Sequence, residues 1–316
     1  MAHDLVVFGD LVADIIIPIE RLPLEHERHG WAEGIFVEPG GAGNVLVAAR
    51  RVGLDTVALG HLGPDRYGTE LRQLLEQEGV TMRYSTVCDD RATVLCIVLA
   101  DRIGQHVYLG VKDNKGLWPM PPTWLDVIRD ANALYTDGYT LRDILAPEDV
   151  FSALAAARNA RVPIFFDPGP SAEYIPRQTL DLAIAAADVL LLAEPELHLL
   201  MPEGDALEAA QSLLALGVSL IVLKRGDRGC QLIDRNGAIT VPGFPVQVVD
   251  TVGAGDSFAA AFIAGWLRGG SPAECAVLAN AMGALVATQR GAGTRIPPRE
   301  RLLAMLADHP TALALA

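Results

Sequence analysis

The sequence predicts an α/β protein in which helices cover both faces of one mostly parallel sheet. Short apolar runs alternate with longer segments of helical periodicity along most of the chain, which is typical of such sheets. The chain has 316 residues, of which 51% are hydrophobic and 20% are charged, so it can bury a large core. No internal repeat, low-complexity tract or long linker interrupts it, and we expect a single domain over residues 1–316.

The expected elements follow from these runs in chain order. Residues 5–8 predict a first buried strand, and similar runs predict strands at 56–60, 133–136, 162–166, 189–192 and 220–223. Segments with helical periodicity lie between them, at 45–52, 69–78, 150–159 and 206–216. From Gly255 onward the chain is almost wholly helical, with helices expected at 256–267, 272–289 and 298–307.

Two regions interrupt this alternation, at about residues 15–37 and 92–112. Each is typical of a pair of extended segments, with partial period-2 alternation and no crossover helix. We therefore expect antiparallel pairing within each region. The two regions predict either an edge of the main sheet or a small separate sheet.

Composition argues against several classes of protein. A formal net charge of −14 does not suit nucleic-acid binding, which rewards clustered Lys and Arg. The N-terminus lacks the basic segment of a signal peptide, and no apolar stretch reaches the ~20 residues of a membrane span. We therefore expect a cytoplasmic protein without membrane contact. The four cysteines form no C-x-x-C pair, so we expect free thiols.

The most informative segment is residues 250–258, Asp-Thr-Val-Gly-Ala-Gly-Asp-Ser-Phe. A strand-like run at 246–249 leads into this glycine-rich turn, which opens directly into an apolar helix. The first N–H groups of a helix have no intrahelical partner, so together with the turn they could hold an anion. Asp256 at the helix start could accept the proton of an attacking hydroxyl, or it could simply cap the helix. We expect the helix terminus to keep the pKa of Asp256 low.

Other motifs for nucleotide or ester chemistry are absent from the sequence. A P-loop needs Gly-Lys-Ser/Thr, and none of the lysines, Lys112, Lys115 and Lys224, follows a glycine. The first strand leads into Gly-Asp-Leu-Val and not into Gly-x-Gly-x-x-Gly, so a dinucleotide-binding fold is not supported. Gly-x-Ser-x-Gly is missing too, which argues against an α/β-hydrolase.

Two further positions offer polar groups to a ligand. Residues 40–44, Gly-Gly-Ala-Gly-Asn, open the helix at 45–52; glycines let a ligand approach the backbone, and Asn44 can both donate and accept. Asp14 comes just after the first strand, where a carboxylate could clamp vicinal hydroxyls or merely form a turn. Because ligands bind at the carboxyl ends of strands in an open parallel sheet, we expect Asp14 and Asn44 at one site.

The two glycine-rich segments together resemble the signatures of the PfkB/ribokinase family. Residues 40–44 are followed by Arg-Val-Gly-Leu at 51–54 and Gly-His-Leu-Gly-Pro-Asp-Arg-Tyr-Gly at 60–68, as in the N-terminal signature. Residues 250–256 match the C-terminal signature, Asp-Thr-x-Gly-Ala-Gly-Asp. The resemblance covers essentially the whole chain. It implies a ribokinase-like fold with a small β-sheet lid, and in-line phosphoryl transfer from ATP with Mg²⁺ to a hydroxyl of a sugar or sugar-like substrate.

The resemblance also implies a role for each residue that matches the family pattern. Asp256 would be the catalytic base, with Gly253, Ala254 and Gly255 as the anion hole. The substrate hydroxyls would contact Asp14, Gly41 and Asn44, and the nucleotide would contact Lys224, Gly226, Gly229 and Asn280. Glu196 would organise Mg²⁺ through water, and Asp250 would belong to a monovalent-cation site, expected to hold K⁺.

The sequence departs from the family pattern at Ala193. The family usually carries Asn-x-x-Glu after the strand expected at 189–192, and this chain has Ala193-Glu194-Pro195-Glu196. Ala193 cannot supply the missing amide, which puts metal affinity in doubt more than reaction type. Glu194 is a neighbour that could compensate.

Other functions remain open from the sequence. A nucleoside kinase of the same fold would use the same Asp256 but stack a base, and a degenerate member would bind sugar or nucleotide as a sensor. Family members that act on phosphorylated sugars often carry a Lys where this chain has Ala42, which favours an unphosphorylated substrate. The lid is also the usual dimer surface in ribokinase-like proteins, so the resemblance implies a homodimer.

Overall fold

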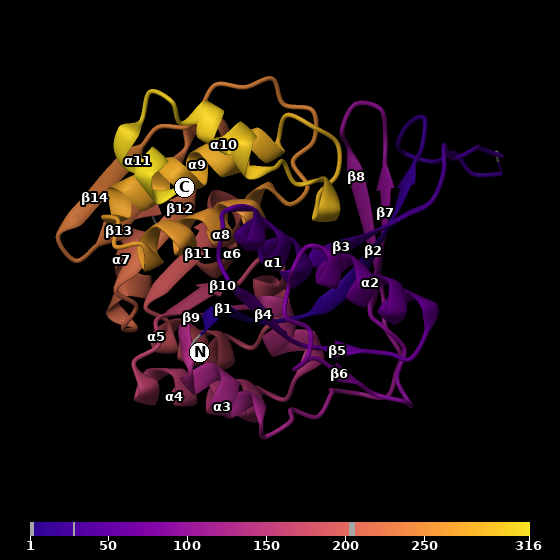
Figure 1. Ribbon diagram of the computed structural model, residues 1–316, viewed down its shortest axis with the longest axis horizontal. Coiled ribbons are helices and arrows are strands. Elements are labelled where there is room, and N and C mark those ends of the chain that lie inside the picture. The colour runs from indigo at the N-terminus through magenta and orange to yellow at the C-terminus, as the bar shows by residue number, and fades with distance from the viewer. Residues whose placement is uncertain (1–2, 28, 202–205) are drawn as a thin grey trace.

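The computed structural model describes residues 3–27, 29–201 and 206–316, and a large mixed sheet forms its centre (Figure 1). The parallel strands of this sheet are β1 (His3–Phe8), β4 (Thr56–Leu59), β9 (Ala131–Asp137), β10 (Ile164–Asp167), β11 (Val189–Ala193) and β12 (Leu220–Lys224). They coincide with the apolar runs in the sequence. Their residues are buried on both faces, as a parallel sheet covered by helices requires.

An antiparallel hairpin that the sequence analysis missed extends one edge of the sheet. β13 (Cys230–Asp234) pairs with β12, and β14 (Gly237–Val241) pairs with β13. The complete eight-stranded order is β14-β13-β12-β11-β10-β9-β1-β4. The chain proceeds from β1 to β4 on one side and returns to β9 on the other, which makes the β1–β9 junction a topological switch point.

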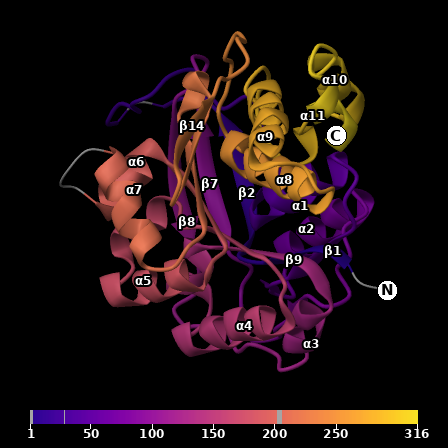
Figure 2. The ribbon, with the colours of Figure 1, turned by 90° about the vertical axis from the view of Figure 1, so that its left-hand side faces the viewer.

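Helices cover both faces of the sheet (Figures 1 and 2). One layer contains α1 (Ala42–Arg51), α2 (Arg66–Gln77), α8 (Ala254–Leu267), α9 (Pro272–Val286), α10 (Arg299–Met305) and α11 (Pro310–Leu315). The other contains α3 (Trp124–Arg129), α4 (Pro147–Ala160), α5 (Arg177–Ala186), α6 (Glu194–Leu200) and α7 (Ala206–Ala215). Successive strand residues alternate between the two cores, as Leu5 and Val6 do in β1.

A separate four-stranded sheet stands beside the main one (Figure 1). It contains β2 (Leu11–Pro18), β3 (Phe36–Gly41), β7 (Leu95–Ala100) and β8 (His106–Val111) in the order β3-β2-β7-β8. The β2–β3 and β7–β8 pairs are antiparallel, as expected, and β2 and β7 join them in parallel. This small sheet begins at Leu11, earlier than the sequence predicts. Asp14 therefore lies inside one of its strands and not in a turn after the first strand of the main sheet.

Several local expectations differ from the structure. Residues 246–249 form no strand; they make an extended loop whose Val249 N–H donates to Ala287 O at 2.8 Å. The helix expected at 272–289 ends at Val286. A short parallel pair joins β5 (His61–Leu62) to β6 (Thr86–Val87), and helical turns occur at η1 (Thr140–Ile144), η2 (Pro170–Tyr174), η3 (Gly226–Arg228) and η4 (Gly293–Arg295). Among the described residues, no helix has the length and apolar character needed to cross a membrane.

Candidate active site

Polar side chains follow the carboxyl ends of successive strands in the main sheet. Asp10 comes after β1, Asp137 ends β9, Asp167 ends β10 and Lys224 ends β12. Because β1 and β9 are neighbours at the switch point, this edge is the position at which an open α/β sheet binds ligands. The start of α8 and the strand β2 reach the same edge through the contacts described next.

The glycine turn before α8 has the geometry of a close backbone approach. Gly253 is the N-cap and has a φ of +71°, a conformation that favours glycine. A Cβ at Gly253 would also lie 2.5 Å from the Cβ of Ala292. Asp256 stands in the first helical turn behind it. The turn therefore tolerates only glycine at its centre and presents the Asp256 carboxylate at the helix start.

The amides of this turn differ in availability. Ala254 N–H donates to Thr251 O at 3.2 Å, which closes the turn. Gly255 lies further into the helix start, and a Cβ there would be 3.6 Å from Lys224 Nζ. An ammonium group thus lies beside the N-terminal end of α8. Both the ammonium and the helix terminus favour an anion at this position.

Asn44 of α1 holds Asp256. Its Nδ2 donates to Asp256 Oδ2 at 2.8 Å, and its Oδ1 accepts from Gly293 N at 2.8 Å. Asn44 is only 3% exposed. The predicted substrate ligand therefore also positions the predicted base, and the loop after α9 in turn fixes the orientation of the amide.

Burial governs the charge state of Asp256. Removal from water raises its pKa to about 6; the hydrogen bond from Asn44 lowers it, and the neighbouring carboxylate of Asp167 raises it. The low pKa expected from the helix terminus is therefore wrong. At neutral pH the carboxylate is still largely ionised and can accept a proton.

Asp14 lies opposite Glu38 in the small sheet and is 8% exposed. Its carboxylate packs against the backbone of Gly40, where a Cβ would overlap it. Burial, followed by repulsion from Asp256 and Glu38, raises the pKa of Asp14 to about 7. The structure thus brings Asp14 into electrostatic contact with Asp256. Gly41, with a φ of +49°, starts α1 from the end of the adjacent strand β3.

Lys224 forms a buried ion pair with Asp167. Its Nζ lies 2.7 Å from Asp167 Oδ2, and the two side chains are 14% and 9% exposed. Burial opposes the charged form of Lys224, but Asp167 and Glu196 raise its pKa above the usual value. Burial and then Asp167 raise the pKa of Glu196. Lys224 is therefore a fixed positive charge among carboxylates.

The family departure at Ala193 has a clear local structure. Ala193 ends β11, and its N–H donates to Glu196 Oε2 at 2.6 Å, so Glu196 caps its own helix α6. Glu194 pairs with Arg225 at 3.0 Å and with Arg228. Glu194 is therefore engaged elsewhere and does not replace the missing amide.

The residues predicted to contact the nucleotide shape two adjoining loops. Gly226 and Gly229 have φ values of +61° and +81° in the turn after β12, and a Cβ on Gly229 would overlap Val241 O. Asn280 of α9 donates from Nδ2 to Val241 O at 3.2 Å and to Pro242 O at 3.1 Å. Lys224, Gly226 and Gly229 are thus close in the chain fold, while their contact with a nucleotide stays a prediction.

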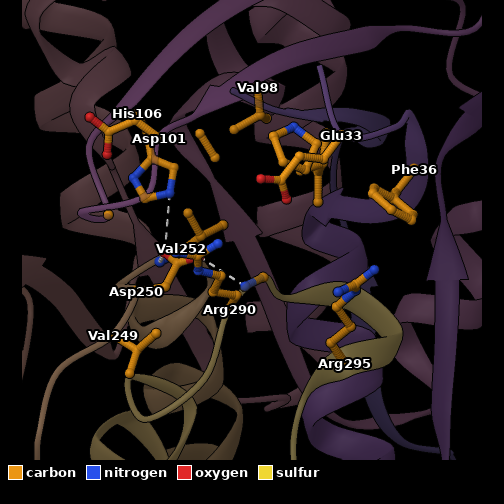
Figure 3. Close-up of a pocket in the computed structure, with 15 residues that line it drawn as sticks. Glu33, Phe36, Val98, Asp101, His106, Val249, Asp250, Val252, Arg290 and Arg295 are labelled. Carbon is orange, nitrogen blue, oxygen red and sulfur yellow. Dashed lines mark hydrogen bonds and ion pairs between the residues drawn. The ribbon is translucent and has the colours of Figure 1, made fainter. Parts of the chain in front are cut away.

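A cavity of about 210 Å³ lies between the small sheet and the loops around Asp250 and Arg290 (Figure 3). In it, Asp250 Oδ1 accepts from Val252 N at 2.9 Å and lies 3.2 Å from His106 Nε2, while Oδ2 accepts from Gly291 N at 2.8 Å. Burial opposes ionisation, but these donors hold the pKa of Asp250 below its usual value. The K⁺ expected here takes oxygen ligands. A carboxylate oxygen has two lone pairs, and at Oδ1 both face nitrogen partners, Val252 N and His106 Nε2. With His106 in place, Oδ1 does not fit K⁺.

Comparisons with known proteins agree with this geometry. The model of the pfkB family carbohydrate kinases matches residues 2–299. The chain is 31% identical to a ribokinase from Arabidopsis thaliana over 318 residues, 96% of this chain and 81% of that protein. It is also 31% identical to a fructokinase from Klebsiella pneumoniae over 311 residues, 94% of this chain and 97% of that protein.

The chain belongs to the pfkB family. A solved structure of Arabidopsis thaliana ribokinase, complexed with ribose and ATP, matches it with a TM-score of 0.83 at 28% identity. The match covers 97% of this chain and 99% of that one. These findings confirm the family and the ribokinase-like fold predicted from the two signatures.

The sequence analysis of this pfkB chain missed two titratable groups around the site, Asp10 and His106. Burial, followed by Asp137, raises the pKa of Asp10 to about 8. Lys112 Nζ of the segment after β8 lies 2.6 Å from Asp143 Oδ1, and His106 of β8 meets Asp250. The Gly-Asp pair after the first strand could have indicated Asp10. His106 carries no signal in the sequence, because a strand of an isolated small sheet gives no indication of which loop it will face.

Proposed function

We propose that this pfkB protein transfers the γ-phosphoryl group of ATP to a hydroxyl of a sugar or sugar-like substrate, with Asp256 as general base. The observation that carries the proposal is the placement of Asp256 in the first turn of α8, held by Asn44 at 2.8 Å and close to Lys224. In phosphoryl transfer, positioning and electrostatics supply most of the catalysis. A fixed base, a helix terminus and an ammonium group are the components that this requires.

On this proposal the acceptor hydroxyls lie against Asp14, Gly41 and Asn44. Asp14 supports the assignment because its carboxylate is nearly buried and electrostatically coupled to Asp256. A carboxylate can accept two hydrogen bonds from vicinal hydroxyls, and the amide of Asn44 can add another contact. Asp256 takes the proton of the attacking hydroxyl as the bond to phosphorus forms.

The nucleotide lies on the other side of Asp256. The transferred group lies at the anion hole predicted from Gly253, Ala254 and Gly255, in which the Ala254 N–H is already bonded to Thr251 O. Lys224 meets the phosphates, while Gly226, Gly229 and Asn280 shape the rest of the nucleotide site. Glu196 would hold Mg²⁺ through water, since one of its carboxylate oxygens is already bonded to Ala193 N and the described residues include no cluster of three or more His, Cys, Asp or Glu that could hold a metal ion. Bound with ATP, Mg²⁺ offsets the negative charge of the phosphates.

The small sheet acts as a lid on this proposal, because its strand β2 carries Asp14 and closing it excludes water. Its outer face mediates a homodimer. The reaction takes place in the cytoplasm, where ATP is supplied. The monovalent cation expected at Asp250 is not part of the proposal, for the reasons of donor chemistry given above.

Replacing the proposed base tests the mechanism. Asp256→Asn should leave the fold and the Kd for ATP unchanged and lower kcat by about 10²–10⁴, the range expected for loss of a general base. The assay follows ADP release over a panel of sugars and nucleosides. Asp149→Asn is the matched control, because Asp149 is the third residue of α4, as Asp256 is of α8.

The panel also separates the alternatives. A variant that turns over its best substrate at the wild-type rate would remove Asp256 from the mechanism. A nucleoside as the best acceptor would identify a nucleoside kinase with the same base. Binding of sugar or ATP without ADP release from any acceptor would identify a sensor.

A further inference from the structure

His106 and Asp250 form a buried contact between the small sheet and the turn that leads into α8 (Figure 3). His106 Nε2 lies 3.2 Å from Asp250 Oδ1, and the two side chains are 9% and 8% exposed. His106 begins β8, and Asp250 precedes Gly253 by three residues. The contact therefore joins a strand of the small sheet to a turn that is distant in the sequence and belongs to neither sheet.

Asp250 is the centre of a local hydrogen-bond network. Its Oδ1 accepts from Val252 N at 2.9 Å, and its Oδ2 accepts from Gly291 N at 2.8 Å. The carboxylate thus fixes the turn before α8 and the loop after α9 at the same time. Both oxygens thus face backbone N–H groups, and His106 Nε2 is a second nitrogen partner of Oδ1.

Other charged groups of the cavity are engaged with different partners. Glu33 pairs with Arg102 at 3.3 Å, and Arg295 pairs with Glu38 at 3.2 Å. The guanidinium of Arg290 donates to Arg102 O at 2.8 Å. Asp250 and His106 are therefore each other's nearest ionic partners within the described part of this cavity.

We propose that His106 takes the place of a monovalent cation at Asp250, so that the anion-hole turn is held in position without K⁺. A side chain that donates to the Asp250 carboxylate gives the turn the same electrostatic anchor as a bound cation, but it does so from the small sheet. His106 is thus a positioning residue that acts through Asp250 on Gly253. This inference rests on the proposed function only for its kinetic consequence.

Thermal unfolding provides a test that does not depend on catalysis. K⁺ is titrated against a constant background of tetramethylammonium, with Na⁺ in parallel, and Tm is measured for the wild type, His106→Ala and His106→Asn. A cation that binds only the folded state raises Tm. The wild type should show no K⁺-specific rise in Tm, while His106→Ala should show a saturable one, because K⁺ can then enter beside Asp250. Gln105→Ala is the matched control, since Gln105 directly precedes β8 and its side chain is exposed.

The kinetic part follows from the same substitution. His106→Ala should lower kcat about 10-fold in tetramethylammonium and regain part of it with K⁺, as expected for loss of one charge-assisted hydrogen bond. A saturable, K⁺-specific rise of Tm in the wild type would overturn the proposal. So would a His106→Ala protein that matches Gln105→Ala in Tm and kcat and whose Tm does not change with K⁺. If His106→Ala fails to fold, the K⁺ titrations of the wild type and of His106→Asn still test the proposal. If no acceptor in the panel gave ADP release, the proposed function would be contradicted. The Tm measurements would still test the role of His106.

Discussion

Asp256 stands in an environment that both supports and opposes its charge. The amide of Asn44 stabilises the carboxylate, while burial and Asp167 favour the protonated form. The net result is a pKa of about 6, close to neutral pH, at which the proposed base would work. A base tuned in this way combines the correct protonation state with a useful affinity for the proton.

The pH dependence of the reaction should report this pKa. Only the ionised carboxylate accepts a proton, so kcat should fall about tenfold per pH unit below pH ~6 and level off above it. Because the Asp14 carboxylate, with a pKa of about 7, binds the acceptor on this proposal, kcat/KM for the acceptor should begin to fall already below pH ~7. An unperturbed Asp would place the break near the ordinary value of about 3.9. The measurement is kcat and kcat/KM for the acceptor between pH 4.5 and 9 at saturating MgATP, with stability checked at each pH. A flat profile down to pH ~4.5 would contradict the raised pKa.

Ala193 should affect the affinity for Mg²⁺ and not the rate of phosphoryl transfer at saturating Mg²⁺. Since the family amide is missing and Glu194 is bound to Arg225 and Arg228, Ala193→Asn should lower the Mg²⁺ concentration needed for half-maximal rate. The expected change is about 2- to 10-fold, with kcat at saturating Mg²⁺ little changed. Glu194→Gln serves as the comparison. An unchanged Mg²⁺ titration would mean that water already fills the place of the amide.

The residues in the two signatures could be predicted from the sequence, and the charges around them could not. Asp256, Asn44 and Gly253 could each be identified because glycine-rich turns and helix starts favour these residue types. The hydrogen bond between Asn44 and Asp256 crosses 212 positions of the chain, and no local pattern encodes it. The pKa of Asp256 was predicted in the wrong direction, because burial by other segments outweighs the helix terminus.

At the level of elements, the β13–β14 hairpin and the start of β2 were harder to predict from the sequence than the parallel strands of the main sheet. The core strands are continuous apolar runs and were predicted, whereas β14 is mostly exposed and the apolar run of β13 is interrupted by Gln231, so the hairpin gave no strong signal. The start of β2 was missed because its first residues, Leu11–Ala13, are apolar and buried, as residues of the main sheet are. The strand-like residues 246–249 have apolar side chains without a neighbouring strand to pair with.

Gly40 in β3 allows a test of how this strand holds Asp14. A Cβ at Gly40 would overlap the Asp14 carboxylate, so Gly40→Ala should displace it. Gly40→Ala and Asp14→Ala should both raise KM for the acceptor by about 10- to 100-fold and leave KM for ATP nearly unchanged. Gly110→Ala is the control, because a Cβ at Gly110 meets nothing within 4 Å. Altered KM for ATP with normal KM for the acceptor would place Asp14 outside the acceptor pocket.

Across the whole molecule, the site is assembled from segments that begin at Asp14 and end at Gly293. The small sheet contributes Asp14, the main sheet contributes Lys224, and the helical C-terminal third contributes Asp256. The overall arrangement could be predicted because it follows from strand order. The relative placement of the two sheets could not, since it depends on contacts such as that between His106 and Asp250.

The outer face of the small sheet should determine the oligomeric state. Val107, Leu109 and Val111 alternate along β8 and are 39%, 52% and 44% exposed. Covering such a row removes apolar area from water. Leu109→Lys should therefore convert a dimer into a monomer, as measured by light scattering. Leu182→Lys on α5 is the control, because Leu182 is also 52% exposed. A monomeric wild type would contradict the proposed dimer.

The buried carboxylates around the switch point give the free energy of unfolding and the proposed reaction opposite dependences on pH. The pKa values of Asp10, Asp14 and Asp256 are raised to about 8, 7 and 6, so the folded chain retains protons that the unfolded chain would release. For these groups the folded state binds more protons than the unfolded state between about pH 4 and 8, and their contribution to the free energy of unfolding falls as pH rises through that window. The proposed reaction needs a higher pH, because Asp256 must be ionised to accept a proton. It therefore takes place at a pH above that at which these carboxylates contribute most to the free energy of unfolding.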